Sequence, residues 1–524
     1  MEATRRGFVK ATAGGVAALA ALNALRVESA SADEAAKRVG GNDLFSGKAN
    51  ARQLTDDLWW VGASDKRIAL FENVYPLSQG VAYNSYILLD EKTVLFDTVD
   101  RSVWGQYFEN VYAVLDGRDL DYLVVNHMEP DHASAISQVL TNFPNATVVT
   151  TAMSAALIKQ FFEIDISDRA LIVAEGDTLT TGAHTLAFVE APMVHWPEVM
   201  VTFDATTGVL FCADAFGSFN ALDGNIFADQ VNFQETWLDE ARRYFCNIVG
   251  KYGPQVQDVL KKAATLDITM LCSTHGPMWR QDLGWIIDKY DKWSRYIPED
   301  NAVAIFYGSI YGGTENAANI LASQISQAGV DNVKVYDVSK THVSYLIAEA
   351  FRCSHLVFAS VTYNMGIFTP MKNFLNDLVV HNMQNRCVSF VENGSWSPAS
   401  GQLMQDIVAT MPNMFQVGDL VTLRSTTSTE NVEALRALAG AIAASVLGDK
   451  SLNTAIAANS NNAQPLAGTV EAAEKVEIAE GAATTKWKCK ICGYEVEVEG
   501  DALPEDFKCP ICGQGPDMFE KIEG

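Results

Sequence analysis

The most constraining feature of the sequence is a cluster of imidazole and carboxylate side chains directly after an apolar run. The run Tyr122 to Val125 predicts a strand, and His127-Met128-Glu129-Pro130-Asp131-His132 follows it. These side chains would repel one another or be buried unpaired unless they shared a cation. Three later strand-like runs end in the same way, at His195, Asp214 and His275. Because strand ends meet at one edge of a sheet, the pattern predicts one metal site built from all four segments.

The chain has 524 residues, which is too long for one hydrophobic core and predicts several domains. Short β-rich runs alternate with helical stretches, a pattern that favours multidomain α/β architecture with parallel sheet. Hydrophobic residues make up 48% and charged residues 19%, which excludes disordered, collagen-like and coiled-coil chains. The formal net charge of -26 argues against a nucleic-acid partner, since phosphate backbones are bound by Lys and Arg.

The amino terminus has the pattern of an export signal. Thr4-Arg5-Arg6-Gly7-Phe8-Val9-Lys10 opens it, an uncharged run from Ala11 to Leu25 follows, and Ala30-Ser31-Ala32 offers a cleavage site. The paired arginines resemble a twin-arginine signal, which predicts a periplasmic or other extracytoplasmic location. The apolar run is too short for a stable membrane span. An uncleaved amphipathic helix is the alternative, and the protein would be cytoplasmic if the signal is not used.

A second site is predicted after the strand-like run Ala302 to Tyr307. The loop that follows is rich in glycine and hydroxyl groups and precedes a helix, which suits a phosphate, although a tight turn is the alternative. Two further loops after strand-like runs place aromatic rings beside polar backbone, as a flavin ring requires. The candidate flavin residues are Ser309, Ile310, Tyr311, Gly312, Gly313, Thr314, Ser360, Val361, Thr362, Tyr363, Asn364, Gly366, Asn393, Gly394, Ser395, Trp396 and Ser397.

A third site is predicted at the tail, where Cys489, Cys492, Cys509 and Cys512 form two C-x-x-C pairs. Two such pairs bring four thiolates around one metal, and the metal supplies folding energy that a forty-residue module lacks. The S4 ligand set accepts either iron or zinc. The remaining five cysteines are scattered singly, so the pattern indicates a metal site and not a disulfide framework.

The H-x-E-x-D-H motif followed by His, Asp and His resembles the metallo-β-lactamase superfamily and, within it, the flavodiiron proteins. Glu129 stands where the hydrolases have histidine, and a carboxylate suits iron better than zinc. The resemblance implies an αββα sandwich with two irons. It implies that His127, Glu129 and His195 hold one iron, that Asp131, His132 and His275 hold the other, and that Asp214 bridges them.

The other two sites extend the resemblance. The loops after the strands resemble flavodoxin, a doubly wound parallel sheet that binds FMN at the carboxyl ends of its strands. Val361 stands where the family has proline, and Pro398-Ala399 stand where it has Gly-Gly. The tail resembles rubredoxin with a shortened loop of sixteen residues between its pairs. The implied segments are a signal over 1–32, a di-iron domain over 50–298, an FMN domain over 301–448, a flexible linker over 449–484 and a rubredoxin-like domain over 485–524.

This order of domains matches flavorubredoxin-type flavodiiron proteins. It implies reduction of O2 to water, of NO to N2O, or both, with electrons passing from rubredoxin iron to FMN to the di-iron site. No NAD(P) fingerprint occurs in the sequence, so we expect an external NAD(P)H-linked reductase or another electron donor. The resemblance also implies a head-to-tail homodimer or a tetramer.

Two other functions fit parts of the pattern. A hydrolase of the metallo-β-lactamase superfamily with accessory electron-transfer domains would bind zinc, and Glu129 counts against it. An electron-transfer protein with a purely structural sandwich would lack the di-iron pair while keeping FMN. Metal analysis with an ultraviolet–visible spectrum separates the three, because rubredoxin iron absorbs in the visible range and zinc does not.

Overall fold

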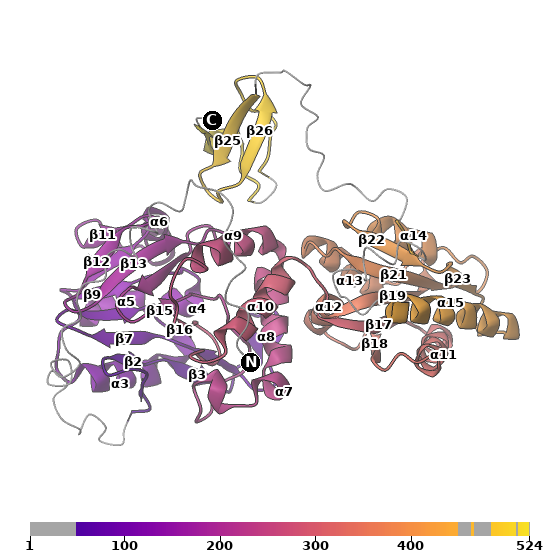
Figure 1. Cartoon of the computed structure of the whole chain (residues 1–524), viewed down its shortest axis with the longest axis horizontal. Helices are drawn as coiled ribbons and strands as arrows, with labels where there is room; N and C mark the ends of the chain where they lie inside the picture. Colours follow the sequence, from indigo (N-terminus) through magenta and orange to yellow (C-terminus); the bar gives the residue numbers. More distant parts are fainter. Residues whose placement is uncertain (1–48, 449–462, 466–483, 510–511, 523–524) are drawn as a thin grey trace, which may run out of the picture. The chain divides into compact units, whose positions relative to one another are not determined.

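The computed structural model describes residues 49–448, 463–465, 484–509 and 512–522 (Figure 1). The signal predicted over 1–32 and most of the linker predicted over 449–484 lie outside these residues. Contacts divide the chain into two compact units. The first unit groups Gln79–Asn232 and Asp258–Leu283 with the described residues up to Ile68, and the second contains Ala69–Ser78, Phe233–Gln257 and the described residues from Gly284 onward.

The first unit contains two sheets. Rings of the two sheets meet: Phe96 and Phe211 stack with their centroids 3.7 Å apart, and both are buried. The larger sheet has the order β1 (Arg52–Gln53), β2 (Leu58–Trp60), β7 (Tyr86–Leu89), β8 (Thr93–Phe96), β9 (Tyr122–Val124), β10 (Thr147–Thr150) and β11 (Ala170–Ile172). The smaller has the order β12 (Thr178–Thr180), β13 (Thr185–Glu190), β14 (Met200–Asp204), β15 (Val209–Phe211) and β16 (Met270–Cys272).

Short helices and hairpins complete this unit. The strand pair β3 (Ala63–Asp65) and β6 (Val81–Tyr83) is antiparallel. The helical elements are η1 (Arg101–Val103), α3 (Trp104–Leu115), α4 (Pro130–Ala133), α5 (Ile136–Asn142), α6 (Ala152–Phe162) and η2 (Ala228–Gln230). In Figure 1, α3 lies outside the larger sheet, next to β2 and β7. The two facing sheets confirm the predicted sandwich architecture.

A buried histidine joins three segments of the first unit. His184 precedes β13, and its Nδ1 lies 2.7 Å from Asp204 Oδ2 while its Nε2 lies 2.8 Å from Asp57 Oδ2. Burial opposes protonation of this ring, but the two carboxylates outweigh it and raise the pKa of His184 to about 10. The ring is therefore an imidazolium that joins the two carboxylates at neutral pH.

We predict a pH-dependent loss of stability in His184→Gln. The pKa is raised in the folded state, so the stabilisation is complete below the unfolded pKa of about 6.5 and is lost as pH rises toward about 10. Removing one partner of a buried charge pair costs about 3–5 kcal/mol. Thermal unfolding at several pH values should show the largest difference from the unsubstituted protein near pH 6 and a steadily smaller one up to pH 10. A difference that stays constant with pH would contradict the ion pairing.

The second unit is built on a twisted, mostly parallel sheet. Its order is β18 (Val333–Asp337), β17 (Asp300–Gly308), β19 (Cys353–Tyr363), β21 (Arg386–Asn393), β22 (Met414–Val417) and β24 (Ala463–Pro465), with β20 (Gly366–Ile367) on β19 and β23 (Val421–Leu423) on β21. β17 lies between β18 and β19. The chain therefore adds its next strand, β18, on one side of β17 and the following strand, β19, on the other side, as in a doubly wound fold. β24 is antiparallel to β22 and falls within the segment predicted as linker.

Helices cover both faces of this sheet, with α11 and α15 on one face and α13 and α14 on the other (Figure 1). A core of aliphatic side chains from β17, α11 and α15 fills the first interface, and it includes Val303, Leu321 and Ile442. The helices are α11 (Gly313–Gln327), α12 (Val343–Arg352), α13 (Thr369–Val380), α14 (Ser400–Val408) and α15 (Thr429–Gly448). By length and composition α15 alone among the described helices is apolar enough to span a membrane, and its inner face belongs to this core.

Further elements group with the second unit. They are the hairpin β4 (Leu70–Phe71) and β5 (Tyr75–Pro76), the helices α7 (Phe233–Thr236) and α8 (Leu238–Tyr244), the π-helical turn η3 (Phe245–Val249), η4 (Gly250–Tyr252), and parts of α9 (Gly253–Ala263) and α10 (Leu283–Ser294). The sequence pattern predicts one helix over Gln234 to Val249. The structure divides this stretch at Trp237 and again where the π-helical turn begins.

The cysteine module is a three-stranded antiparallel sheet. Its order is β26 (Glu495–Glu499), β25 (Thr484–Cys489) and β27 (Phe519–Ile522), with the short helix η6 (Pro516–Met518) before the last strand. Together with the two α/β folds, this module confirms the predicted multidomain fold class.

Candidate functional site

All seven predicted di-iron ligands lie together in the first unit. They come from the segment after β9, the loop between β13 and β14, the turn after β15 and the turn after β16. Pro130 at the first position of α4 starts a helix whose first turn carries Asp131 and His132, directly after Glu129 at its N-cap. The four segments converge on one site although β9 belongs to the larger sheet and β13, β15 and β16 to the smaller, so the ligands gather where strand ends of both sheets meet and not at one edge of one sheet.

The seven side chains form two clusters. His127, Glu129, His195 and Asp214 offer ligand atoms within 4.8 Å of one another, and so do Asp131, His132 and His275. Asp214 connects the clusters, since its Oδ2 lies 3.2 Å from His195 Nε2 and its Oδ1 lies 2.8 Å from His132 Nε2. Each oxygen of this one carboxylate thus faces a different cluster. This geometry is the one that a bridging ligand needs.

The ligand atoms are buried and poor in hydrogen bonds. Both carboxylate oxygens of Asp131 and Oδ2 of Asp214 are buried and have no hydrogen bond of good geometry among the described residues, although imidazole nitrogens of the clusters face them at 3.2–3.3 Å. Orphaned polar atoms of this kind are costly unless a cation is shared. The donor set of four imidazoles and three carboxylates suits iron. The residues present therefore fit a di-iron pair.

Electrostatics support cation binding. Burial opposes protonation of the histidines, but the surrounding carboxylates outweigh it and raise the pKa of His132 to about 9 and that of His195 to about 10. Burial works to raise the pKa of Glu129, but His127 and His195 outweigh it and hold that pKa below its usual range. The site thus attracts positive charge, and metal binding would displace protons from the rings.

Neighbouring groups that the sequence analysis missed hold the ligands in place. His275 Nδ1 lies 2.7 Å from the carbonyl oxygen of Ala82, and Glu198 Oε1 lies 2.8 Å from His127 Nδ1. Asp97 accepts hydrogen bonds from the backbone and side-chain nitrogens of Asn126 at 2.7 and 2.8 Å. Glu198 lies three residues after His195, so its position in the sequence could have marked it as a neighbour of the metal site. No local pattern marked Asp97 or Ala82, because their contacts are with residues far along the chain.

The first predicted flavin loop begins a helix. Gly312 has a φ of +87°, a conformation that L side chains rarely adopt, and it precedes α11. No side chain caps the first turn of α11, so its N–H groups can bind a phosphate. A Cβ on Gly313 would lie 2.1 Å from the carbonyl oxygen of Ser425. Glycine is therefore required where this loop passes the segment after β23.

The second predicted loop is a β-hairpin. The sequence pattern predicts a strand that ends near Ser360, but β19 continues to Tyr363 and pairs with β20 across a turn at Asn364 and Met365. The hydroxyl oxygen of Thr362 accepts hydrogen bonds from the backbone nitrogens of Ala399 and Ser400. Thr362 therefore joins this hairpin to the start of α14.

The third predicted loop is joined to a fourth that the sequence analysis missed. The side chain of Asn393 donates to the carbonyl oxygen of Ser425 at 3.0 Å and accepts from its N–H at 2.9 Å. The hydroxyl of Ser425 donates to Ser395 at 2.8 Å. Trp396 is 86% exposed and Tyr311 is 99% exposed. Exposed aromatic rings beside an uncapped helix N-terminus fit the ring and phosphate of FMN.

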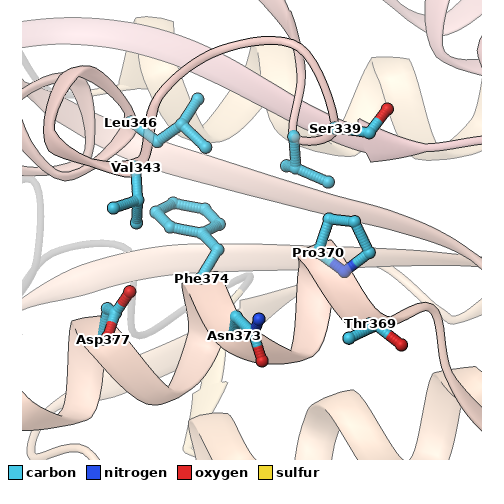
Figure 2. A pocket seen from close by; sticks show the side chains of 9 residues that line it. Ser339, Val343, Leu346, Thr369, Pro370, Asn373, Phe374 and Asp377 are labelled. Carbon is cyan, nitrogen blue, oxygen red and sulfur yellow. The ribbon is translucent and has the colours of Figure 1, made fainter. Parts of the chain in front are cut away.

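A cavity of about 410 Å³ in the second unit is separate from these loops (Figure 2). It lies between α12 and α13, and Figure 2 shows the ring of Phe374 between Val343 and Leu346 on one side and Pro370 on the other. None of the predicted site residues lines it.

The four cysteines of the tail lie in two matching turns. Gly493 and Gly513 follow the pairs with φ of +72° and +74°, and each donates its N–H to the first cysteine of its pair at 2.9 and 2.8 Å. The Sγ atoms of Cys489 and Cys512 are 3.6 Å apart, and those of Cys492 and Cys509 are 3.4 Å apart. A tetrahedral site with bonds of about 2.3 Å has edges of about 3.8 Å, so the thiols fit one metal ion. Burial and the thiols of Cys509 and Cys489 raise the pKa of Cys512 to about 11, so a metal would displace its proton.

Family models match three segments of the chain. They are ODP family beta lactamase over residues 81–276, flavodoxin over 305–413 and the rubredoxin-like domain of rubrerythrin over 487–520.

Whole-protein comparisons agree with these matches. The chain is 31% identical to an uncharacterised protein of Methanocaldococcus jannaschii, over 62% of this chain and 80% of that one. It is also 31% identical to the anaerobic nitric oxide reductase flavorubredoxin of Pectobacterium atrosepticum, over 66% of this chain and 68% of that one.

Solved structures show the same architecture. The rubredoxin oxygen:oxidoreductase of Desulfovibrio gigas superposes with a TM-score of 0.72 at 27% identity, over 76% of this chain and 99% of that one. The flavodiiron protein of Giardia intestinalis superposes with a TM-score of 0.70 at 24% identity, over 78% of this chain and 98% of that one, which shows the shared fold.

Proposed function

This chain belongs to the flavodiiron protein family and is an oxidoreductase with the flavorubredoxin order of domains, and we propose that it reduces O2 to water, NO to N2O, or both. Its cofactors are FMN, a di-iron pair and one iron held by four cysteines. The observation that carries the proposal is the placement of Asp214 between two clusters of iron-type ligands.

The residues of the chain have distinct parts in this proposal. His127, Glu129 and His195 would hold one iron, and Asp131, His132 and His275 would hold the other. When bound, these irons and the FMN supply the redox chemistry, with electrons proposed to pass from the cysteine-bound iron to FMN and on to the di-iron pair. The protein buries six of the seven ligands, leaves Glu129 partly exposed, and orients the rings of His127 and His275 through Glu198 and the carbonyl of Ala82.

Loss of one ligand provides the test of this function. In Glu129→Ala or His275→Asn, consumption of O2 and NO by the anaerobically reduced protein should be abolished while FMN stays bound, because the flavin loops belong to the other compact unit. Oxygen- and NO-electrode assays in parallel measure the activity and also give the preferred substrate. Undiminished turnover in both variants would refute the site assignment.

A hydrolase is the alternative proposal. Metal analysis excludes the hydrolase if the two metal positions hold iron. Glu129 in place of a histidine and the two electron-transfer modules favour the reductase. A zinc-loaded protein that hydrolyses a lactam or thioester would favour the hydrolase.

The partners and the location are proposals of the same kind. We expect a head-to-tail homodimer or tetramer, an external electron donor and, from Arg5 and Arg6, export to a periplasmic or other extracytoplasmic location. Size-exclusion chromatography with light scattering tests the oligomeric state, because a monomer would exclude the proposed dimer and tetramer. Cell fractionation of the full chain tests the last, since a protein found only in the cytoplasm would exclude export.

A further inference from the structure

Glu198 is a buried carboxylate that contacts a ligand ring but belongs to neither ligand cluster. Its Oε1 lies 2.8 Å from His127 Nδ1 and accepts a hydrogen bond from the backbone nitrogen of Met128 at 2.9 Å. The other ring nitrogen, Nε2, lies 3.3 Å from both Glu129 Oε2 and Asp214 Oδ2. With Nε2 facing the metal position, Nδ1 carries the hydrogen that Glu198 accepts.

The second cluster lacks this arrangement in the described part of the chain. His275 Nδ1 donates to a neutral acceptor, the carbonyl oxygen of Ala82, at 2.7 Å. His132 Nδ1 is buried with no hydrogen-bond partner there. Asp97, the other buried carboxylate nearby, bonds to Asn126 and to the backbone nitrogen of His127 and not to a ligand ring. The two metal positions therefore differ by one carboxylate, at His127.

We propose that Glu198 is a positioning residue that makes the two irons inequivalent. It holds His127 with Nε2 toward the metal and places one negative charge against the far side of that ring. A carboxylate in this place makes the imidazole nitrogen a stronger ligand for the metal and stabilises the metal's higher oxidation state. The iron at the His127 position should therefore have the lower reduction potential of the pair. This inference rests on the proposed function, because it concerns iron bound at these residues.

Glu198→Gln tests the charge, because glutamine keeps the shape and an acceptor oxygen. In a redox titration of the iron-loaded full chain followed by electron paramagnetic resonance, one iron couple should shift upward and the other should stay unchanged. We expect about a tenfold change in the ratio of Fe(III) to Fe(II) affinity, which equals about 59 mV for a one-electron couple. Iron retained after dialysis against a chelator should also fall, because lost outer partners weaken metal binding about 10–100-fold.

Two further variants separate charge from packing. Glu198→Asp keeps the charge, so its potential should lie nearer to that of the unsubstituted protein than to that of Glu198→Gln, even if iron retention falls. Glu109→Gln makes the same change at an exposed position on α3 and should alter neither quantity. Equal shifts of both couples, no shift at all, or equal potentials in Glu198→Asp and Glu198→Gln would overturn the inference. If the unsubstituted protein binds no iron pair, the proposed function fails instead.

Discussion

Asp214→Ala should lower the consumption of O2 and NO by at least about a thousandfold, or about 4 kcal/mol of activation free energy. The physical reason is that its two oxygens face different clusters, at 2.8 Å from His132 Nε2 and 3.2 Å from His195 Nε2. No other described carboxylate faces both clusters in this way. Removing it leaves four imidazoles with less compensating charge and no ligand between the metals. Metal analysis should show iron lost from both positions, and electrode assays should show the loss of turnover.

Asp223→Ala is the matched control for this prediction. Asp223 is in the same compact unit, and its side chain is 82% exposed and paired only with Lys66 in the ion pairs of the described residues. An exposed pair contributes about 0–1 kcal/mol, so the control should keep both irons and full activity. An Asp214→Ala protein that kept two irons and turned over within tenfold of the control would contradict the bridging role.

Arg386→Met should destabilise the second unit by about 4 kcal/mol. The side chain is fully buried, and within the described residues its guanidinium donates to five carbonyl oxygens and to no carboxylate: Ala350 (2.9 Å), Phe351 (2.6 Å), Tyr296 (2.7 Å), Gln384 (2.9 Å) and Asn385 (3.0 Å). Burial lowers its pKa to about 10, so the group is still charged at neutral pH. Methionine fills similar space but removes the donor from the three buried carbonyls of Ala350, Phe351 and Tyr296, which costs about 1–3 kcal/mol for each one that water does not reach.

Thermal unfolding measures this effect. At about 2–4 °C per kcal/mol for a unit of this size, the melting temperature should fall by about 8–16 °C. Arg295→Met is the control, because Arg295 is exposed and its pair with Asp291 is on the surface, so we expect a change within about 0.5 kcal/mol. Equal melting temperatures for the two variants would show that the carbonyl contacts of Arg386 contribute little.

Much of the metal site could be predicted because its ligands follow strands. His127 to His132 come directly after a buried strand of the larger sheet, and the other three ligands follow strands of the smaller sheet. Residue type and order are local information. The roles of the individual ligands stay predictions until the variants are measured.

Local breaks in the elements could not be predicted in the same way. The apolar run Tyr83 to Leu89 predicts one strand, but β6 ends at Tyr83 and β7 begins at Tyr86. Asn84 interrupts it, since its side chain accepts from Trp60 and donates to the carbonyl oxygens of Ser273 and Gly276. A helix predicted over Ala133 to Leu140 is likewise divided, with α4 ending at Ala133 and α5 starting at Ile136. Two of the three partners of Asn84, Ser273 and Gly276, are nearly 200 residues away in sequence.

The sequence by itself determined the chemistry of this protein: which ligand types occur, in what order, and on which strands. The tertiary structure alone decided which oxygen of Asp214 faces which cluster, that Glu198 bonds to His127, and that the segment after β23 joins the flavin loops. The reason is the range of the interactions. Hydrophobic periodicity and motif spacing act over a few residues, whereas a buried hydrogen bond requires two groups that meet only after the chain has packed.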